Sequence, residues 1–242
     1  MEINLEFGGQ SYQCDLSKGI DLSSTYGDPN REPCAWHAEP ARSEPIRQGE
    51  WVGSVQEGSP VNFYRHHLSP HGNGTHTEGF GHISPGREPV GEGLSDFHFI
   101  AWLNWQQPQD GLLRLADLQQ SWPKKDPEAL ILLTELAFPQ DFSGQNPPAI
   151  EVDIMTFIRQ AGVQHLLTNL PSVDPEEDDG ALAAHKAFWH YPQKPDPTAT
   201  ITELLFAPAE LKRGWYLLNL QVAPLHGDAS PSRPVIYPLE SF

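Results

Sequence analysis

The chain has few cysteines, no long apolar run and no secretory signal, which are the features typical of secreted and membrane proteins. Its 242 residues include only two cysteines, Cys14 and Cys34. One bridge at most can form, which excludes a disulfide framework and a zinc site built from thiolates. No apolar run approaches the roughly 20 residues that cross a bilayer, and the longest runs, 99–103 and 129–133, fit buried strands. The first residues also lack the basic and apolar regions of a secretory signal. We therefore expect a cytoplasmic protein.

Basic charge is scarce as well. Lysine and arginine total 15 against 32 acidic residues, a formal net charge of −17. A protein that follows a phosphate backbone needs a broad basic surface, and an anionic membrane surface attracts basic proteins. The composition thus excludes nucleic acid and membrane as partners and favours a small neutral or zwitterionic substrate.

Turn-forming residues are abundant, with 24 prolines and 20 glycines. They predict short elements and few long helices. Alternation and apolar runs predict strands at 3–7, 61–68, 97–105, 129–133, 163–167, 214–223 and 235–237. Helical spacing predicts helices at 148–161 and 181–189, while 26–49 should be an extended surface segment and 226–232 a polar turn. With no internal repeat, we expect one strand-rich, mixed α/β domain over residues 1–242.

Histidine is the residue in excess, with 11 copies, and three of them gather in one glycine-rich stretch. His71, His76 and His82 lie within twelve residues together with Glu78. On an extended segment, His76 and Glu78 point to one face about 7 Å apart along the strand. Nitrogen and oxygen donors without thiolate suit Zn²⁺, Mn²⁺ or Fe²⁺. On composition alone, a histidine-rich surface loop explains the stretch equally well.

Two further polar residues stand in apolar surroundings. His185 lies on the apolar stripe of the helix expected at 181–189, and Glu203 lies between Ile201 and Leu204. Taken alone, His185 is best explained as a core histidine. A buried carboxylate needs a partner, however, and a metal ion is the strongest one. A metal site explains these two residues and the histidine stretch together.

The motifs resemble the metal-dependent cyclase family, whose best-known members are bacterial kynurenine formamidases. The resemblance rests on three segments in family order: Gly74-Thr75-His76-x-Glu78 with His82; Pro171-Ser172-Val173-Asp174 followed by Leu182 to His185; and Thr202-Glu203-Leu204 followed by Gly214-Trp215-Tyr216. With the flanking strands it covers about residues 15–239. The sequence departs from the family pattern in two places. Gly72 and Asn73 both intervene before Gly74, where the family has one residue, and Glu78 replaces an Asp.

The resemblance implies a single-domain swivelling β/β/α fold with one or two divalent ions, zinc or manganese. It assigns the ligands by position: His71, His76 and Glu78 for one ion, with Glu78, Glu203 and His185 for a second. His82 would be the catalytic acid and base, and Trp36 would contact the substrate. The implied reaction is hydrolysis of a small amide or formamide, such as N-formylkynurenine in tryptophan catabolism. We also expect a homo-oligomer, a dimer or a tetramer.

Two other functions stay open at this point. A cupin-like metal enzyme also uses His and Glu ligands on strands, although its His-x-His spacing is not seen here and His185 is expected on a helix. A non-catalytic small-molecule binding protein, with a structural metal or none, is the second alternative. An open coordination position would favour catalysis over a structural metal.

Overall fold

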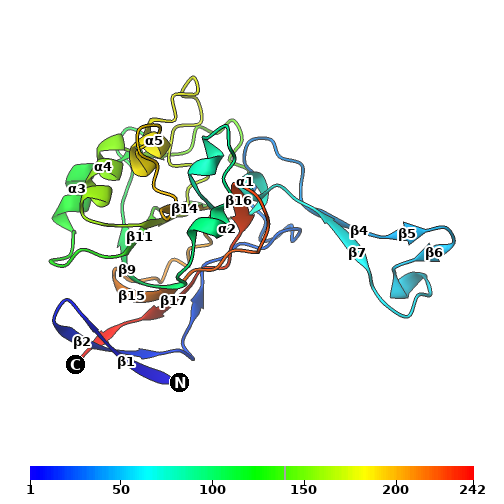
Figure 1. Cartoon of the computed structure of the whole chain (residues 1–242), viewed down its shortest axis with the longest axis horizontal. Coiled ribbons are helices and arrows are strands. Elements are labelled where there is room, and N and C mark those ends of the chain that lie inside the picture. Colours follow the sequence, from blue (N-terminus) through cyan, green and yellow to red (C-terminus); the bar gives the residue numbers. More distant parts are fainter. Residues whose placement is uncertain (139) are drawn as a thin grey trace.

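A computed structural model describes residues 1–138 and 140–242 of the chain. Its body is built on a curled sheet of nine strands in the order β16-β8-β14-β13-β11-β9-β15-β17-β3 (Figure 1). The strand bounds are β3 (Ile20–Asp21), β8 (His76–Glu78), β9 (His98–Trp105), β11 (Ala129–Leu133), β13 (His165–Thr168), β14 (Thr200–Glu203), β15 (Gly214–Asn219), β16 (Ala229–Pro231) and β17 (Val235–Pro238).

The four central strands β9, β11, β13 and β14 are parallel, and the outer strands join them antiparallel. All five residues of β11 are buried, as expected for a parallel strand covered on both faces. Leu130 and Leu132 belong to the core cluster on the helical face, whereas Ile131 belongs to the cluster on the opposite face. The apolar runs that predicted strands at 97–105 and 129–133 thus form the middle of the sheet.

Three helices cover the face of the sheet that carries Leu130 and Leu132. They are α3 (Leu115–Gln120), α4 (Val152–Gln160) and α5 (Ala183–Trp189). The prediction of a helix at 148–161 is wrong at its start, because β12 (Ala149–Ile150) pairs there with β10 (Leu112–Leu113). Two carboxylates that precede α5 accept backbone N–H groups at its start. An oxygen of Asp174 accepts the backbone N–H of Ala184 at 2.7 Å.

Short elements complete the body. They are α1 (Pro70–Asn73), α2 (Val90–Gly93) and the 3₁₀ turn η2 (Phe80–His82). A three-stranded sheet of β1 (Glu2–Phe7), β2 (Gln10–Asp15) and β18 (Glu240–Ser241) lies below the main sheet in Figure 1 and carries both termini.

A hairpin projects from the body on the right of Figure 1. It contains β4 (Arg42–Pro45), β5 (Arg47–Gln48), β6 (Trp51–Val52), the 3₁₀ turn η1 (Val55–Glu57) and β7 (Tyr64–His67). The extended surface segment predicted at 26–49 is confirmed from Arg42 to Gln48, where β4 and β5 are extended and mostly exposed. It is wrong before that, because residues 26–37 contain turns, and Pro33 and Ala35 are buried. The interpretation of 226–232 as a turn is also wrong in part, because β16 lies within it and pairs with β8.

The expected fold class is confirmed: the chain is mixed α/β and strand-rich, with few helices. Cys14 and Cys34 are both free. Within the described residues, none of the helices has the length and apolar character that crossing a bilayer demands.

Replacing Ile131 by alanine should strongly destabilise the protein. The side chain is fully buried in the central strand, and truncations of this kind cost about 2–5 kcal/mol in unfolding free energy. Urea unfolding measures the loss. Val152, which is 39% exposed, provides the control. A Val152→Ala loss as large as that of Ile131→Ala would contradict the placement of the core.

Candidate metal centre

Six polar side chains converge at the β16–β8–β14 edge of the sheet. β8 carries His76 and Glu78 on one face, and its register with β14 sets Glu203 directly opposite His76. α1, η2 and α5 bring in the three remaining imidazoles. The structure thus brings together all the residues assigned to metal binding and acid–base chemistry: His71, His76, Glu78, His82, His185 and Glu203.

Glu78 is the middle of this cluster and is completely buried. One of its oxygens, Oε1, lies 3.1 Å from His185 Nε2. The other, Oε2, lies 3.2 Å from His71 Nδ1 and 3.7 Å from His82 Nδ1. A carboxylate with its two oxygens facing different imidazoles is arranged as a bridge between two positions.

Glu203 forms a second, smaller group with His76 and with His185, which also contacts Glu78. Its Oε2 lies 3.5 Å from His76 Nε2, and its Oε1 lies 3.9 Å from His185 Nε2. The Oε1 atom also accepts the backbone N–H of Val173 at 3.1 Å. This bond holds the carboxylate in place from the loop before α5.

Each of three imidazoles faces the carboxylates with one nitrogen and is anchored through the other. His71 Nε2 lies 3.1 Å from Asp228 Oδ2, and His185 Nδ1 lies 2.6 Å from Asp174 Oδ2. His76 Nδ1 donates to the carbonyl of Gly74 at 3.0 Å. An acceptor on the outer nitrogen fixes the ring and directs the inner lone pair at a metal, the usual arrangement around histidine ligands.

Two buried atoms of the cluster have no hydrogen-bond partner among the described residues. They are His76 Nε2 and Glu78 Oε2. Buried polar atoms are nearly always paired, so an unpaired nitrogen and an unpaired carboxylate oxygen at one point fit a cation between them. The donors are nitrogen and oxygen only, which suits zinc or manganese.

The electrostatics of the cluster favour positive charge at the same point. Burial alone would lower the pKa of His185, but hydrogen bonding to Asp174 and Glu78 raises it to about 10. Burial would likewise lower the pKa of His71, yet Glu78 raises it to about 9. For Glu78, the neighbouring imidazoles outweigh burial and hold its pKa well below the ordinary value. Protons or a divalent cation can supply this charge.

His82 and Trp36 stand on the open side of the cluster. The side chain of His82 is 30% exposed, and its ring centroid lies 4.4 Å from that of His71. Trp36 lines a cavity of about 410 Å³ whose wall also includes His71. Trp36 and His37 both have left-handed backbone angles, with φ of 59° and 52°. The backbone N–H of His37 donates to Ser143 Oγ at 2.8 Å and helps to hold this strained turn.

Sequence reasoning missed the anchoring role of two aspartates. Asp174 belongs to the second of the family motifs, but the motif does not predict its contact with His185. Asp228 lies in the stretch expected to be a turn. It contacts His71 and forms an ion pair with Arg87 at 3.0 Å. Nothing in the local sequence around Asp228 distinguishes it from other polar turn residues.

The cluster of histidines and carboxylates at the edge of the mixed sheet could hold a metal ion. Residues 15–175 match the model of the Cyclase family. The chain therefore belongs to the Cyclase family, and the cupin-like alternative is wrong. No curated protein matches it in sequence.

Solved structures share the fold over nearly the whole chain. A potential metal-dependent hydrolase with cyclase activity is 14% identical with a TM-score of 0.64, covering 91% of this chain and 98% of its own. Isatin hydrolase A from Labrenzia aggregata is 15% identical with a TM-score of 0.64 and coverages of 92% and 94%. Isatin hydrolase A from Ralstonia solanacearum is 16% identical with a TM-score of 0.62 and coverages of 91% and 91%. The chain shares its fold with these three proteins.

Replacing His185 by alanine should lower the metal content while leaving most of the fold intact. His185 faces both glutamates, so its loss removes a donor from the centre. Elemental analysis of protein purified without chelator measures the effect against the wild type, for which about one to two equivalents of zinc or manganese are expected.

His165 offers a matched control. It is also a buried histidine, but it bonds Thr200 Oγ1 at 2.9 Å outside the cluster. His165→Ala should lower the melting temperature and keep the metal. If His185→Ala behaves in the same way, His185 is a core histidine and not a ligand.

Proposed function

We propose that this protein is a metal-dependent hydrolase of a small amide or formamide, acting on a carbon–nitrogen bond that is not a peptide bond. The main support is the arrangement of the centre. Buried nitrogen and oxygen donors surround one point, and a partly exposed histidine stands beside it. N-formylkynurenine is the first substrate to test, following the resemblance of the motifs to kynurenine formamidases.

The proposed ligands divide between two ion positions that share Glu78. His71 and His76 would hold one ion with Glu78, while Glu203 and His185 would hold a second, and zinc or manganese suits both. A divalent ion at this place supplies an activated water and polarises the substrate carbonyl. Asp228, Gly74 and Asp174 keep the three ligand rings oriented from behind.

The proposal assigns proton transfer to His82. Its Nδ1 lies 3.7 Å from Glu78 Oε2 and 3.8 Å from Asp228 Oδ2, so two carboxylates lie beside the ring. In amide hydrolysis, a water adds its oxygen to the carbonyl carbon, and the leaving nitrogen must gain a proton. His82 would take the proton from the water and deliver it to that nitrogen.

The position of Trp36 is an argument for a substrate that contains an aromatic ring. Its side chain is 41% exposed and lines the cavity that reaches His71. An indole at the wall of a cavity offers a flat apolar face on which an aromatic ring can stack. The net charge of −17 disfavours a polyanion, and a small neutral or zwitterionic molecule fits the charge better.

The structural neighbours suggest a second substrate within the same chemistry. Two of those described above are isatin hydrolases, and isatin contains an amide closed into a ring against an aromatic ring. A cyclic amide and a formamide share the same reacting group, a carbonyl carbon bonded to nitrogen. Isatin therefore belongs beside N-formylkynurenine in the assay.

Metal-loaded protein should hydrolyse at least one of three substrate types: an N-formyl aromatic amine, a cyclic aromatic amide or a lactone. A steady-state assay measures kcat/KM for each. Chelator should abolish the activity, and returned zinc or manganese should restore it. Loaded protein that hydrolyses none of them would favour the binding-protein alternative.

Replacing His82 by alanine should cut turnover about 10²–10⁴-fold and leave the metal content unchanged, because the residue transfers protons and does not hold the ion. His98→Ala, at an exposed histidine on β9, is the matched control and should keep full turnover. If His82→Ala loses metal in proportion to activity, His82 is a ligand and the proton-transfer role is wrong.

A further inference from the structure

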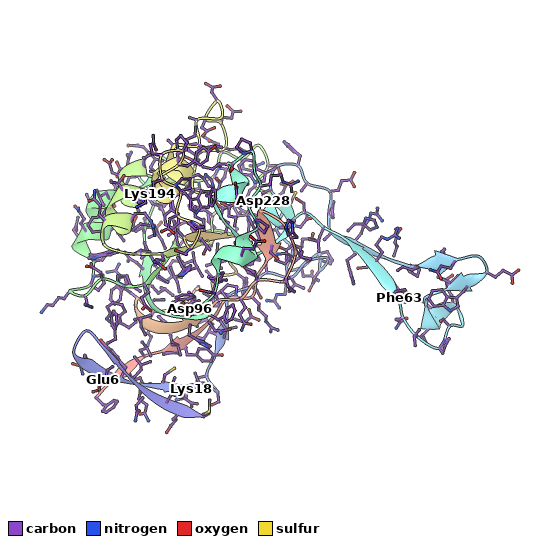
Figure 2. All side chains as sticks on the ribbon, in the orientation of Figure 1. Glu6, Lys18, Phe63, Asp96, Lys194 and Asp228 are labelled. Atoms are coloured by element: carbon purple, nitrogen blue, oxygen red, sulfur yellow. The ribbon has the colours of Figure 1, made fainter. Side chains whose placement is uncertain are left out.

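A second cavity, of about 600 Å³, lies where the two edge strands of the curled main sheet approach each other. Asp21 of β3 and Pro231 of β16 both line it. Asp228, which Figure 2 labels beside β16, precedes this strand and contacts His71, whereas Pro231 ends the strand in the cavity wall. The cavity shares no residue with the metal centre or with the cavity at Trp36. It is a separate place on the molecule.

Two arginines give this cavity a positive charge. Arg31 and Arg233 line it, and among the described residues of its wall Asp21 is the one acidic side chain. Two positive side chains against one negative leave a formal charge of +1, in a chain whose formal charge is −17. A local excess of positive charge in an acidic protein suits an anionic ligand.

Both guanidinium groups are held in place and keep N–H groups for a ligand. Arg233 donates through Nε and one terminal nitrogen to Asp21 Oδ2, at 2.8 Å each. Arg31 donates one terminal nitrogen to the carbonyl of Ser23 at 3.2 Å, and its guanidinium carbon lies 5.4 Å from the centroid of the Phe206 ring. A guanidinium has five N–H donors, so neither set of contacts uses them all. Arginines anchored in this way bind phosphate and carboxylate oxygens well.

Hydroxyl groups supply much of the remaining polar wall. Ser232 is the most informative of them, because it is only 8% exposed and its buried Oγ has no hydrogen-bond partner among the described residues. Buried polar atoms are nearly always paired, so an oxygen of a ligand in this cavity fits the unpaired hydroxyl. The other hydroxyl residues in the wall are Ser23, Ser24, Thr25 and Tyr26.

The walls match a phosphate monoester that carries a small organic group. Such a phosphate has three charged oxygens, which suit two arginines and several hydroxyls better than the two oxygens of a carboxylate do. Val222, Ala223 and Pro231 add an apolar part to the wall, where an organic group can lie. A volume of about 600 Å³ is in the range of small-molecule sites.

The polar wall of this cavity is bonded directly to Thr75, the residue before His76. The backbone N–H of Thr75 donates to Ser24 Oγ at 2.6 Å. Its carbonyl accepts the hydroxyl of Tyr26 at 3.0 Å and the backbone N–H of Ser232 at 3.1 Å. Three residues that line the cavity thus hold one residue of the chain that leads into β8.

Thr75 also connects this chain to β14. Its Oγ1 donates to the carbonyl of Leu204 at 2.7 Å, and Leu204 directly follows Glu203. Thr75 therefore adjoins His76 along the chain and the residue after Glu203 through a hydrogen bond. A ligand that fixes the cavity wall would restrict the backbone beside two of the proposed metal ligands.

We infer that this cavity binds a small phosphate monoester and that the bound ligand restricts the backbone at Thr75. Arg31 and Arg233 hold the phosphate, Ser232 Oγ bonds one of its oxygens, and the apolar wall receives the organic group. The site does not depend on the proposed function, because none of its residues belongs to the metal centre.

Calorimetric titration of the purified full chain tests the ligand class. Phenyl phosphate should bind. Inorganic phosphate, which lacks the organic group, and benzoate, which has two oxygens, should both bind more weakly. Added salt should weaken the binding of phenyl phosphate, because the arginines are exposed to solvent. Phenyl phosphate that does not bind, or that binds no better than benzoate, would overturn the inference.

Two variants test the place of binding. Arg31→Gln and Arg233→Gln should each weaken the binding of phenyl phosphate about tenfold, because each removes hydrogen bonds from a charged donor. Both side chains are exposed, so the melting temperature should change little. Arg65→Gln is the matched control: it removes the same charge at an exposed position on β7 and should leave the affinity unchanged. Full affinity in the double variant Arg31→Gln/Arg233→Gln would place the anion elsewhere, such as the metal centre, and overturn the site.

Hydrogen–deuterium exchange tests the link to Thr75. Phenyl phosphate should slow exchange several-fold in peptides that cover 22–26 and 231–233, which line the cavity, and also in a peptide that covers 72–78, which does not. Peptides from the hairpin at 42–67 should exchange as before. Slowed exchange confined to the cavity wall would overturn the link, and slowed exchange at 72–78 that persists in the double variant would overturn the site.

Discussion

Two buried carboxylates set the constraint on which this site depends. Glu78 and Glu203 are 0% and 4% exposed, and the ion-pair partners that the structure gives them are all imidazoles. Buried negative charge on this scale is stable only with matching positive charge close by. The anchored rings of His71, His76 and His185 provide donors for a cation at the same point. Asp228 and Asp174 hold the His71 and His185 rings in the orientation that this cation needs.

The sequence predicted the parts of this arrangement that local spacing determines. The interval from His76 to Glu78 places both on one face of a strand, and the apolar stripe around His185 places it on the inner face of α5. The central strand β11 was predicted residue by residue, because a wholly apolar run buried on both faces has few other structures open to it. The order of the three motifs along the chain then indicated the resemblance to one family.

Long-range contacts could not be predicted in this way. Asp228 meets His71 across 157 residues of chain, and its own surroundings have the composition of an ordinary turn. The extended segment predicted at 26–49 and the strand predicted at 61–68 meet in the projecting hairpin, but local composition does not predict that β4 pairs with β7. The start of α4 was misplaced because pairing with β10 overrides the helical preference of Ala149 and Ile150. In each case, tertiary pairing decided what local preference left open.

The position of the centre near a sheet edge has a consequence for how the molecule opens. β8 has only three residues, and it is held between β14 and the equally short β16. A cation bound by residues from α1, β8, α5 and β14 would act as a cross-link between them. The loops closed in this way would be up to about a hundred residues long, so the cation would lower the entropy of any state in which this edge is detached. Removing the ion would therefore loosen the edge first and expose the glycine-rich stretch to proteases. The parallel strands β9, β11 and β13 would meanwhile stay folded.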